Sequence, residues 1–387
     1  MTAVSTAIPS AGTTARPQAE AVIDLDAVAH NVRVLTARAG SADVMAVVKA
    51  DGYAHGAVPV ARAALASGAA ELGVATVREA LALRAAGIAA PVLCWLHAPG
   101  ADFGAAIEHD VEIAVSTPRQ IADVAAAARE LGRRATVSLK VDTGMNRGGL
   151  APDVFDAALD LLAAERGSLD VRGVFSHLVA ADEPGDPVTD LQKRRFDAAV
   201  DAMVRAGVPP RVRHLANSAA TLLRPDLAYD MVRPGIAVYG LSPAPEVGAF
   251  DLRPVMTLRA TVVLLKHVPA GGGVGYGHRW IAPRDTVVAL LPIGYADGVV
   301  RSLSNRYEVA IRGRRHPAVG RVSMDQIVID VGPGTDVEVG DAAYLFGPGD
   351  HGEPTAQDWA GTLNTIGYEV VTGVRGRVER TYRGGDA

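Results

Sequence analysis

Short β-like runs alternate with longer Ala-rich helical runs from about residue 43 onward, and no other feature limits the possible folds of the chain so strongly. The eight β-like runs are Asp43–Lys49, Glu71–Ala75, Pro91–Trp95, Val111–Val115, Ala135–Val141, Val171–His177, Arg211–Leu215 and Asp230–Arg233. Helical patterns lie between them at Val58–Ala66, Val77–Ala86, Pro118–Leu131, Pro152–Ala164 and Asp190–Ala206. This alternation predicts a parallel β/α architecture. An eight-stranded, TIM-like barrel is its natural closed form, and a doubly wound open sheet is the alternative.

The pattern changes after about Ser242. Helical periodicity nearly vanishes, and Gly and Pro punctuate the β-like runs Thr261–Leu265, Thr286–Leu291, Gln326–Val331 and Ala342–Phe346. We therefore expect a tail over residues 1–19, a cofactor-binding barrel over 20–242 and a mostly-β domain over 243–387. The β-like segment Ala21–Leu25 is compatible with either domain.

Composition narrows the function classes. Hydrophobic residues make up 49% of the chain, charged residues 21%, and the net charge is −5 without a basic run, so we expect a globular protein that binds no nucleic acid. Cys94 is the only cysteine, which excludes intrachain disulfides and cysteine-based metal clusters. No stretch is apolar enough for a membrane span or a signal peptide. We predict a cytoplasmic location, no membrane contact and a mobile N-terminal tail.

Titratable and polar residues recur where the predicted strands end. The barrel fold places catalytic groups at the C-terminal ends of its strands. Those positions carry Lys49, Lys140, His177, His214 with Asn217 and Ser218 after it, and Arg233 with Gly235 after it. The sequence therefore predicts a functional site at this end of the barrel.

Lys49 is one of only four lysines in a chain that otherwise uses arginine. An amine at the end of a buried strand is partly desolvated, which lowers its pKa and suits Schiff-base formation with an aldehyde cofactor. A lysine that extends its amine from the barrel rim into solvent is the alternative interpretation.

Two neighbouring segments suggest a phosphate site. Ser218 follows the seventh β-run and Gly235 follows the eighth, and loops after the last two barrel strands often bind phosphate. An ordinary helix cap at Ser218 and an ordinary turn at Gly235 are the alternatives. The glycine-rich run 271–277 lacks the context of a nucleotide loop, so we interpret it as a loop that presents Tyr276. His177 and Asp182 lack close metal-ligand spacing, and no metal is expected.

With these residues assembled, the chain resembles the alanine racemases among fold-type III pyridoxal-phosphate enzymes, from about residue 21 to about residue 377. The motifs that carry the resemblance are VKADGYAHG (48–56), KVDTGMNR (140–147), SHL (176–178), HLANS (214–218), RPGI (233–236), VGYG (274–277), PIGYADG (292–298), GRVSMD (320–325) and GYE (367–369). The resemblance implies an isomerase that interconverts L- and D-alanine through an aldimine of pyridoxal 5′-phosphate and supplies D-alanine for peptidoglycan.

The resemblance also implies roles for residues. Lys49 would hold the cofactor and act as one base, and Tyr276 would enter from a partner subunit as the second base, which implies a homodimer with shared active sites. Arg233 would face the pyridine nitrogen, and His177 would bridge Arg233 and Tyr276. The other implied cofactor contacts are Tyr53, Arg147, Asn217, Ser218, Gly235, Ile236 and Tyr368. Substrate contacts would be Arg147 and the partner's Met324, and the entrance would be lined by Asp182, Tyr295, Arg301 and Arg321.

Lys140 lies seven residues before Arg147, and two cations converging on one site would repel each other. In the family this lysine is often carbamylated, so we predict carbamylation of Lys140. Departures from the family pattern are Asn146, Gly148, Trp280, Ser323 and Gly367. They leave both predicted bases in place and bear on the range of substrates.

Three other functions remain open at this point. A racemase of serine or of a broader amino-acid set would share every feature above. A pyridoxal-phosphate decarboxylase would share Lys49 but would not need Arg233 with Tyr276. A non-enzymatic pyridoxal-phosphate carrier would not need the β-domain that presents Tyr276 and Met324.

Overall fold

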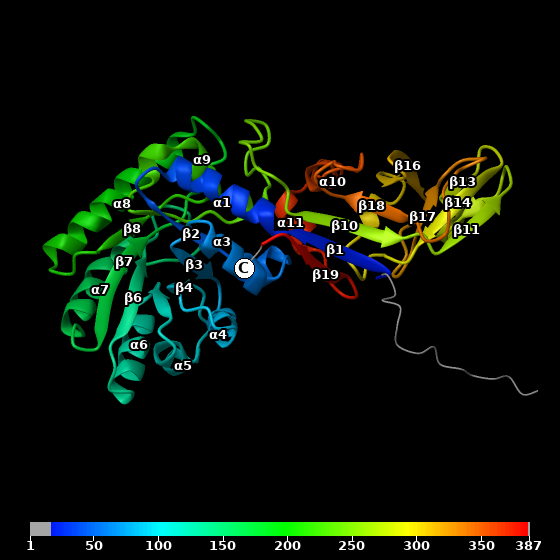
Figure 1. Cartoon of the computed structure of the whole chain (residues 1–387). Helices are drawn as coiled ribbons and strands as arrows, with labels where there is room; N and C mark the ends of the chain where they lie inside the picture. The colour runs from blue at the N-terminus through cyan, green and yellow to red at the C-terminus, as the bar shows by residue number, and fades with distance from the viewer. Residues whose placement is uncertain (1–16, 386–387) are drawn as a thin grey trace, which may run out of the picture.

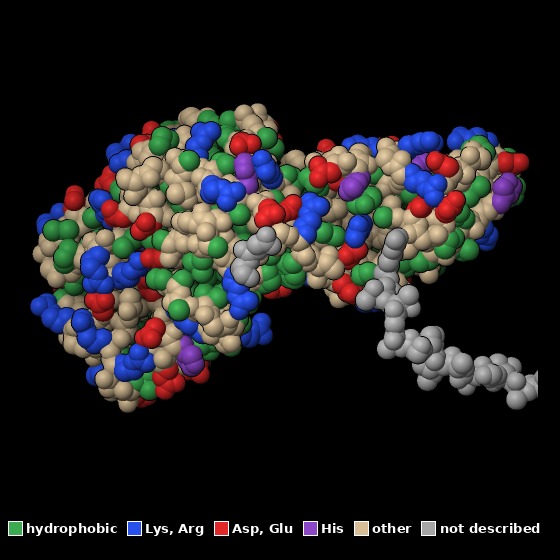
Figure 2. All heavy atoms as spheres, viewed as in Figure 1, with side chains coloured by type: hydrophobic (Ala, Val, Ile, Leu, Met, Phe, Trp, Pro, Cys, Tyr) green, Lys and Arg blue, Asp and Glu red, His purple; other side chains and the backbone are tan. Residues whose placement is uncertain are grey.

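A computed structural model describes residues 17–385 and shows two lobes joined side by side (Figure 1). The predicted tail over residues 1–19 lies mostly outside the described residues, and strand β1 (Ala19–Asp24) begins at its last position. Within the described range, no helix is both long and apolar enough to cross a bilayer. Acidic and basic side chains are interspersed over the visible face of both lobes (Figure 2).

The first lobe is the predicted barrel. Its parallel strands run in the order β8-β7-β6-β5-β4-β3-β2-β9. Backbone hydrogen bonds from Asp230 to Arg213 and from Arg233 to Ala216 join the segments of β9 and β8, so the sheet closes. The strands are β2 (Asp43–Val47), β3 (Glu71–Val74), β4 (Val92–Cys94), β5 (Glu112–Val115), β6 (Ala135–Lys140), β7 (Leu169–Phe175), β8 (Val212–His214) and β9 (Met231–Val232). All eight predicted strands are confirmed, and the open-sheet alternative is wrong.

Helices pack around the outside of the barrel (Figure 1). They are α1 (Leu25–Ala39), α3 (Ala57–Ala66), α4 (Val77–Ala85), α5 (Phe103–Glu108), α6 (Pro118–Glu130), α7 (Pro152–Ala164), α8 (Pro187–Arg205) and α9 (Ser218–Leu223), with the 3-10 turns η1 (Pro225–Leu227) and η2 (Ile236–Tyr239). Several begin at side-chain caps, such as Thr76 on α4 and Thr117 on α6, which satisfy free backbone N–H groups. The short helix α5 was not predicted.

The second lobe contains a nine-stranded sheet in the order β11-β14-β17-β16-β15-β18-β10-β1-β19 and a separate hairpin of β12 and β13. The strands are β1 (Ala19–Asp24), β10 (Met256–Thr261), β11 (Leu264–Val268), β12 (Gly273–Val274), β13 (Trp280–Ile281), β14 (Thr286–Leu291), β15 (Glu308–Ile311), β16 (Arg314–Val319), β17 (Ile327–Asp330), β18 (Ala342–Phe346) and β19 (Glu379–Arg383). The mostly-β character is confirmed. The predicted run Thr261–Leu265 is wrong in detail, because it spans the break between β10 and β11.

Four shorter elements complete the described part of this lobe: the 3-10 turns η3 (Tyr276–His278) and η4 (Arg301–Leu303), and the helices α10 (Ala356–Leu363) and α11 (Gly367–Thr372). Neither helix was predicted. Thr355 and Asp358 form a capping box at the start of α10, and that Thr-x-x-Asp pattern is the sequence signal for a helix start that was missed.

The segment Ala21–Leu25, which the sequence left open, lies mainly in β1, and β1 belongs to the second lobe. It pairs antiparallel with β10 and parallel with β19, and α1 follows it directly. The chain therefore passes from β1 in the second lobe to α1 in the barrel lobe without a linker. Buried Asn31 of α1 fixes this junction, because its side chain bonds to the backbone of Val238 and Arg253.

A buried ion cluster occupies the N-terminal end of the barrel. Arg172 donates hydrogen bonds to Glu71 and Glu112, which are the first residues of β3 and β5. Glu112 also accepts a hydrogen bond from Ser138. These buried polar groups form hydrogen bonds with one another and fill the N-terminal end of the barrel. The functional site is therefore expected at the C-terminal end.

Candidate active site

A pocket of about 190 Å³ opens at the C-terminal ends of the barrel strands. It is lined by Val47, Lys49, Tyr53, Trp95, Lys140, Arg147, Phe175, His177, Asn217, Ser218, Arg233, Gly235, Ile236 and Tyr368. Every residue predicted to contact the cofactor thus borders one cavity, together with Lys140.

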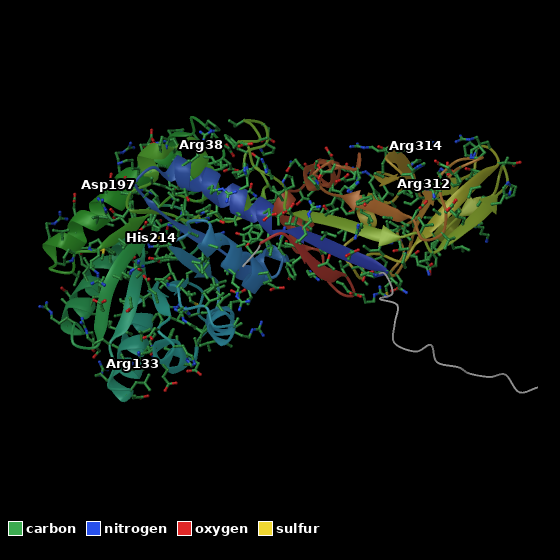
Figure 3. All side chains as sticks on the ribbon, in the orientation of Figure 1. Arg38, Arg133, Asp197, His214, Arg312 and Arg314 are labelled. Carbon is green, nitrogen blue, oxygen red and sulfur yellow. The ribbon has the colours of Figure 1, made fainter. Side chains whose placement is uncertain are left out.

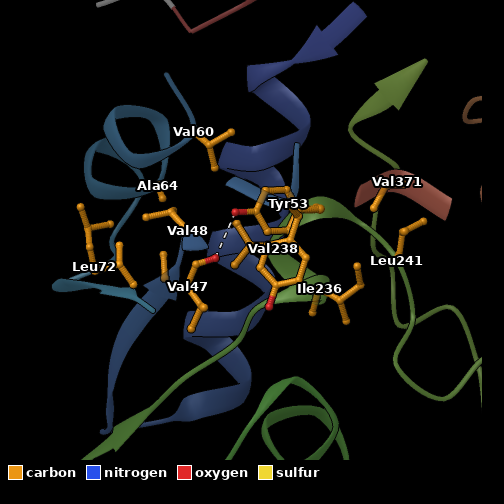
Figure 4. Packing of buried hydrophobic residues seen from close by; sticks show 14 of the residues in the cluster. Val47, Val48, Tyr53, Val60, Ala64, Leu72, Ile236, Val238, Leu241 and Val371 are labelled. Carbon is orange, nitrogen blue, oxygen red and sulfur yellow. Dashed lines mark hydrogen bonds between the residues drawn. The ribbon is translucent and has the colours of Figure 1, made fainter. Parts of the chain in front are cut away.

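Lys49 is presented by an unusual turn. The segment labelled α2 (Lys49–Tyr53) has left-handed backbone angles, with φ between 52° and 65° from Ala50 to Ala54. Each non-glycine residue in this conformation costs roughly 1–2 kcal/mol, so tertiary contacts hold the turn. Tyr53 at the end of this turn is buried in one cluster with Val47, Val48 and Val238 (Figure 4).

The amine of Lys49 is partly buried and has a lowered pKa, first because of desolvation and second because of the nearby Arg147 cation. Lys49 Nζ lies 5.9 Å from the ring centre of Tyr53. A lowered pKa leaves more neutral amine near neutral pH, and the neutral amine is the nucleophilic and basic form. This geometry favours the functional interpretation of Lys49 over that of a lysine at the barrel rim.

A cluster of hydrogen-bonding groups borders the pocket at Tyr53, Ser218 and Gly235. Ser218 Oγ accepts hydrogen bonds from the backbone N–H groups of Gly235 (2.8 Å) and Ala237 (3.3 Å). A Cβ on Gly235 would lie 2.3 Å from the Tyr53 hydroxyl oxygen, so glycine is what lets this hydroxyl approach. The hydroxyls of Tyr53 and Tyr368 make no hydrogen bond to any residue in 17–385 and remain free to donate.

Arg233 is buried and held by carbonyl and imidazole acceptors. It donates to His214 Nδ1 (3.2 Å) and to the carbonyl oxygens of His214, Ser176 and Leu215. Burial lowers the pKa of Arg233 to about 9, which still leaves a cation at neutral pH. His214 lies inside the barrel lobe (Figure 3) and stacks on Phe175.

His177 does not hydrogen-bond to Arg233 in this structure, and among the described residues that contact belongs to His214 instead. Burial and the cations Arg233 and Arg147 lower the pKa of His177 to about 3, so the ring is neutral. The sequence places His214 in a predicted β-run and at the start of the HLANS motif, but indicates no role for it. Its burial could not be derived from the sequence.

Lys140 and Arg147 converge on the pocket as predicted. The pKa of Lys140 is lowered by burial and then by Arg147 and Arg233. A neutral lysine amine is the form that combines with carbon dioxide, so the site fits the predicted modification.

Trp95, Val47 and Phe175 line the pocket and were missed. Trp95 ends the third predicted β-run, and its position at the end of a strand was the signal that could have found it. Gly73 makes room for it, because a Cβ there would lie 2.7 Å from the Trp95 ring.

The remaining predicted site residues lie outside this pocket. Tyr276 and Met324 lie in the second lobe and are 70% and 53% exposed. Tyr276 begins η3, between β12 and β13, and that hairpin is far from β2 in the same chain (Figure 1). Asp182 lies near Tyr368 and helps raise the pKa of that tyrosine, after desolvation. The structure does not place Tyr295, Arg301 and Arg321 at the pocket.

Comparisons with known proteins agree with this geometry. Residues 23–243 match the family model "Alanine racemase, N-terminal domain", and residues 255–382 match "Alanine racemase, C-terminal domain". The chain belongs to the alanine racemase family. This family depends on pyridoxal 5′-phosphate, and its members are isomerases.

Individual relatives match nearly end to end. The alanine racemase of Mycobacterium tuberculosis H37Rv is 60% identical over 368 residues, which is 94% of this chain and 96% of the relative. The enzyme of Mycolicibacterium smegmatis is 61% identical over 94% of both chains. Among solved structures, the alanine racemase of Streptomyces lavendulae superposes with a TM-score of 0.92 at 48% identity, covering 96% of this chain and 98% of that one.

The pocket fits the cofactor of alanine racemases. A pyridoxal phosphate needs an amine, a cradle for its phosphate and a partner for its ring nitrogen. Lys49 brings an amine to the pocket, Arg233 brings a guanidinium, and Gly235 leaves space beside the free Tyr53 hydroxyl. Asn146, one of the predicted departures from the family pattern, has φ of 54°, and asparagine is among the few residues other than glycine that tolerate this conformation.

Proposed function

We propose that this chain interconverts L- and D-alanine by a two-base mechanism in which Lys49 of one subunit and Tyr276 of the partner subunit act on opposite faces of the substrate. The observation that carries the proposal is the convergence of Lys49, Arg233 and the Tyr53–Ser218–Gly235 cluster on one cavity. The product D-alanine would feed peptidoglycan synthesis, in a cytoplasmic location.

Different residues of the pocket would bind the cofactor phosphate and the substrate carboxylate. Tyr53, Ser218, Gly235, Ile236 and Tyr368 would hold the phosphate through hydroxyl and backbone N–H donors. Arg147 would bind the substrate carboxylate with its planar guanidinium, together with Met324 of the partner subunit. When bound, pyridoxal phosphate supplies an electron sink for negative charge at the substrate Cα.

Proton transfer needs one group on each face of Cα. The Lys49 amine, with its lowered pKa, would take the proton on one face, and the hydroxyl of the partner's Tyr276 would deliver one on the other. The reverse direction exchanges these roles. Burial lowers the pKa of His177, and the nearby basic groups of Arg233, Arg147, Lys140 and Lys49 lower it further, so it would act as a neutral hydrogen-bonding group.

Arg233 would limit side reactions. A guanidinium holds its proton tightly, so it would hydrogen-bond to a ring nitrogen without protonating it. Negative charge at Cα would then be less stabilised, which would couple the two proton transfers closely and suppress transamination. A decarboxylase would benefit from the opposite arrangement.

A homodimer would complete the site. Tyr276, Met324 and Ile281 are all at least half exposed on the second lobe of a single chain. Tyr276 lies just before β13, and β13 is far from β2 of the same chain (Figure 1). In this arrangement Asp182, Tyr295, Arg301 and Arg321 would line the entrance that forms between the subunits.

The test is chiral analysis after incubation of the purified protein with L-alanine, L-serine and L-lysine. We expect D-alanine to accumulate fastest. Lys49→Ala should lose the bound cofactor's absorbance, and Tyr276→Phe should keep it while racemisation falls strongly, more in one direction than in the other. Faster racemisation of serine would favour the broader racemase, and release of carbon dioxide would favour the decarboxylase.

A further inference from the structure

The left-handed turn after Lys49 is tied to the neighbouring strand by a single carboxylate. Glu79 Oε1 accepts a hydrogen bond of 2.8 Å from the backbone N–H of Ala50. Its other oxygen, Oε2, accepts hydrogen bonds from the N–H groups of Ala75 (2.8 Å) and Thr76 (3.1 Å). One side chain therefore joins the residue next to Lys49 to the end of β3 and the start of α4.

Half of this arrangement is an ordinary capping box. Thr76 caps α4 and Glu79 bonds back to the backbone of Thr76, as in many helix starts. The bond from Ala50 is additional, because a capping box does not need a backbone donor 29 residues earlier in the chain. The second capping box in the described chain, Thr355 with Asp358 on α10, makes no comparable contact.

The far end of the same turn is held from the other lobe. Arg380 of β19 donates a hydrogen bond of 3.1 Å to the carbonyl oxygen of Ala54, and its remaining N–H groups bind Val374 and Val378. The turn is thus fixed at Ala50 by Glu79 and at Ala54 by Arg380. A backbone with five consecutive positive φ angles does not persist without such contacts.

We infer that Glu79 is a positioning residue for Lys49. The carboxylate of Glu79 holds the left-handed turn that directs the Lys49 amine into the pocket. The inference rests on the proposed role of Lys49 as the cofactor-binding lysine. Glu79 also acts on the amine electrostatically: it opposes the effect of Arg147 on the pKa of Lys49. Glu79 does not itself line the pocket, so it acts through the backbone and charge of its neighbours.

The experiment compares Glu79→Ala and Glu79→Gln with two matched controls. Thr76→Ala removes the hydroxyl that caps α4 but leaves the bond between Glu79 and Ala50. Asp358→Ala removes the acidic member of the second capping box, away from the pocket. Two readouts are used: hydrogen–deuterium exchange of residues 48–56 without cofactor, and the fraction of chains with pyridoxal phosphate trapped on Lys49 by borohydride at limiting cofactor.

We expect Glu79→Ala to raise the exchange rate of residues 48–56 and to lower the trapped fraction, each by about tenfold, because a charge-assisted bond is lost. Glu79→Gln should give values between those of wild type and Glu79→Ala. Its single carbonyl oxygen cannot accept hydrogen bonds both from Ala50 and from Ala75 with Thr76. Thr76→Ala and Asp358→Ala should match wild type in both readouts, even if they melt at a lower temperature.

Equal behaviour of Glu79→Ala and Thr76→Ala would overturn the inference, because it would reduce Glu79 to a helix cap. If Glu79→Ala does not fold, the comparison of Glu79→Gln with Thr76→Ala decides in the same way. Wild-type protein that traps no cofactor on Lys49 would contradict the proposed function. Hydrogen–deuterium exchange would still test whether Glu79 holds the turn after Lys49.

Discussion

The hydroxyl of Tyr53 occupies the space that a side chain on Gly235 would need, with only 2.3 Å between the Tyr53 oxygen and the position of a Cβ. We predict that Gly235→Ala displaces this hydroxyl and weakens pyridoxal phosphate binding about tenfold or more, because one donor to a charged phosphate is lost. Equilibrium dialysis measures the effect. Gly167→Ala is the control, since nothing lies within 4 Å of its Cβ position. Equal affinities in the two variants would contradict the prediction.

Lys140 should carry a carbamate. Its lowered pKa provides neutral amine, and an anion there would relieve the repulsion with Arg147. Intact mass and ¹³C-bicarbonate NMR of the native protein should show one modified lysine per chain, absent in Lys140→Arg. Exposed Lys266 serves as the internal reference for an unmodified lysine. An unmodified amine in bicarbonate-saturated buffer would rule the carbamate out.

Mixed subunits should test the shared active site. If Tyr276 acts on the partner's pocket, a hybrid of one Lys49→Ala chain and one Tyr276→Phe chain contains one intact and one doubly defective site. Random mixing makes half of the dimers hybrid, so about a quarter of wild-type activity should return. Each variant alone gives the baseline. No recovery after subunit exchange, verified by native mass spectrometry, would place Tyr276 outside the partner's site.

Buried histidines should make the protein acid-sensitive. Burial lowers the pKa of His55 to about 4, and that of His214 lies well below the ordinary value for the same reason. Because the unfolded chain binds these protons near pH 6.5, stability is present above that pH and is lost as pH falls toward 4. Each histidine contributes about 1.4 kcal/mol per pH unit in this window. Urea denaturation of wild type and His55→Gln from pH 7 to 4.5 measures the slope, which should be shallower in the variant; equal slopes would exclude a contribution from His55.

Asn31 should be critical for joining the two lobes. Asn31→Ala leaves the carbonyl of Val238 and both backbone groups of Arg253 without their partner, at a cost of about 2–4 kcal/mol. Thr36→Ala is the control on the same helix, because its hydroxyl bonds to the carbonyl oxygen of Val32 within α1. The denaturation midpoint of Asn31→Ala should lie clearly below that of Thr36→Ala. Similar midpoints for the two variants would show that the junction does not depend on Asn31.

Much of the barrel could be predicted because its signals are local. Each β-run is short and apolar, and each of the longer helices has a continuous periodic pattern, so strand count and order followed without tertiary information. Residues at the strand ends, such as Lys49 and Arg233, could then be assigned to one end of the barrel from topology alone. The short elements α5, α10 and α11 were missed because six to eight residues carry too little periodicity.

Other features depend on contacts between residues far apart in the chain. The sequence determined which residues end the barrel strands, and hence most of the pocket lining. Only the tertiary structure decided that β1 joins the second sheet, that His214 rather than His177 bonds to Arg233, and that the turn after Lys49 is left-handed. The reason is physical: local sequence sets periodicity and caps, whereas burial, hydrogen-bond partners and strained backbone angles are set by the atoms that packing brings alongside.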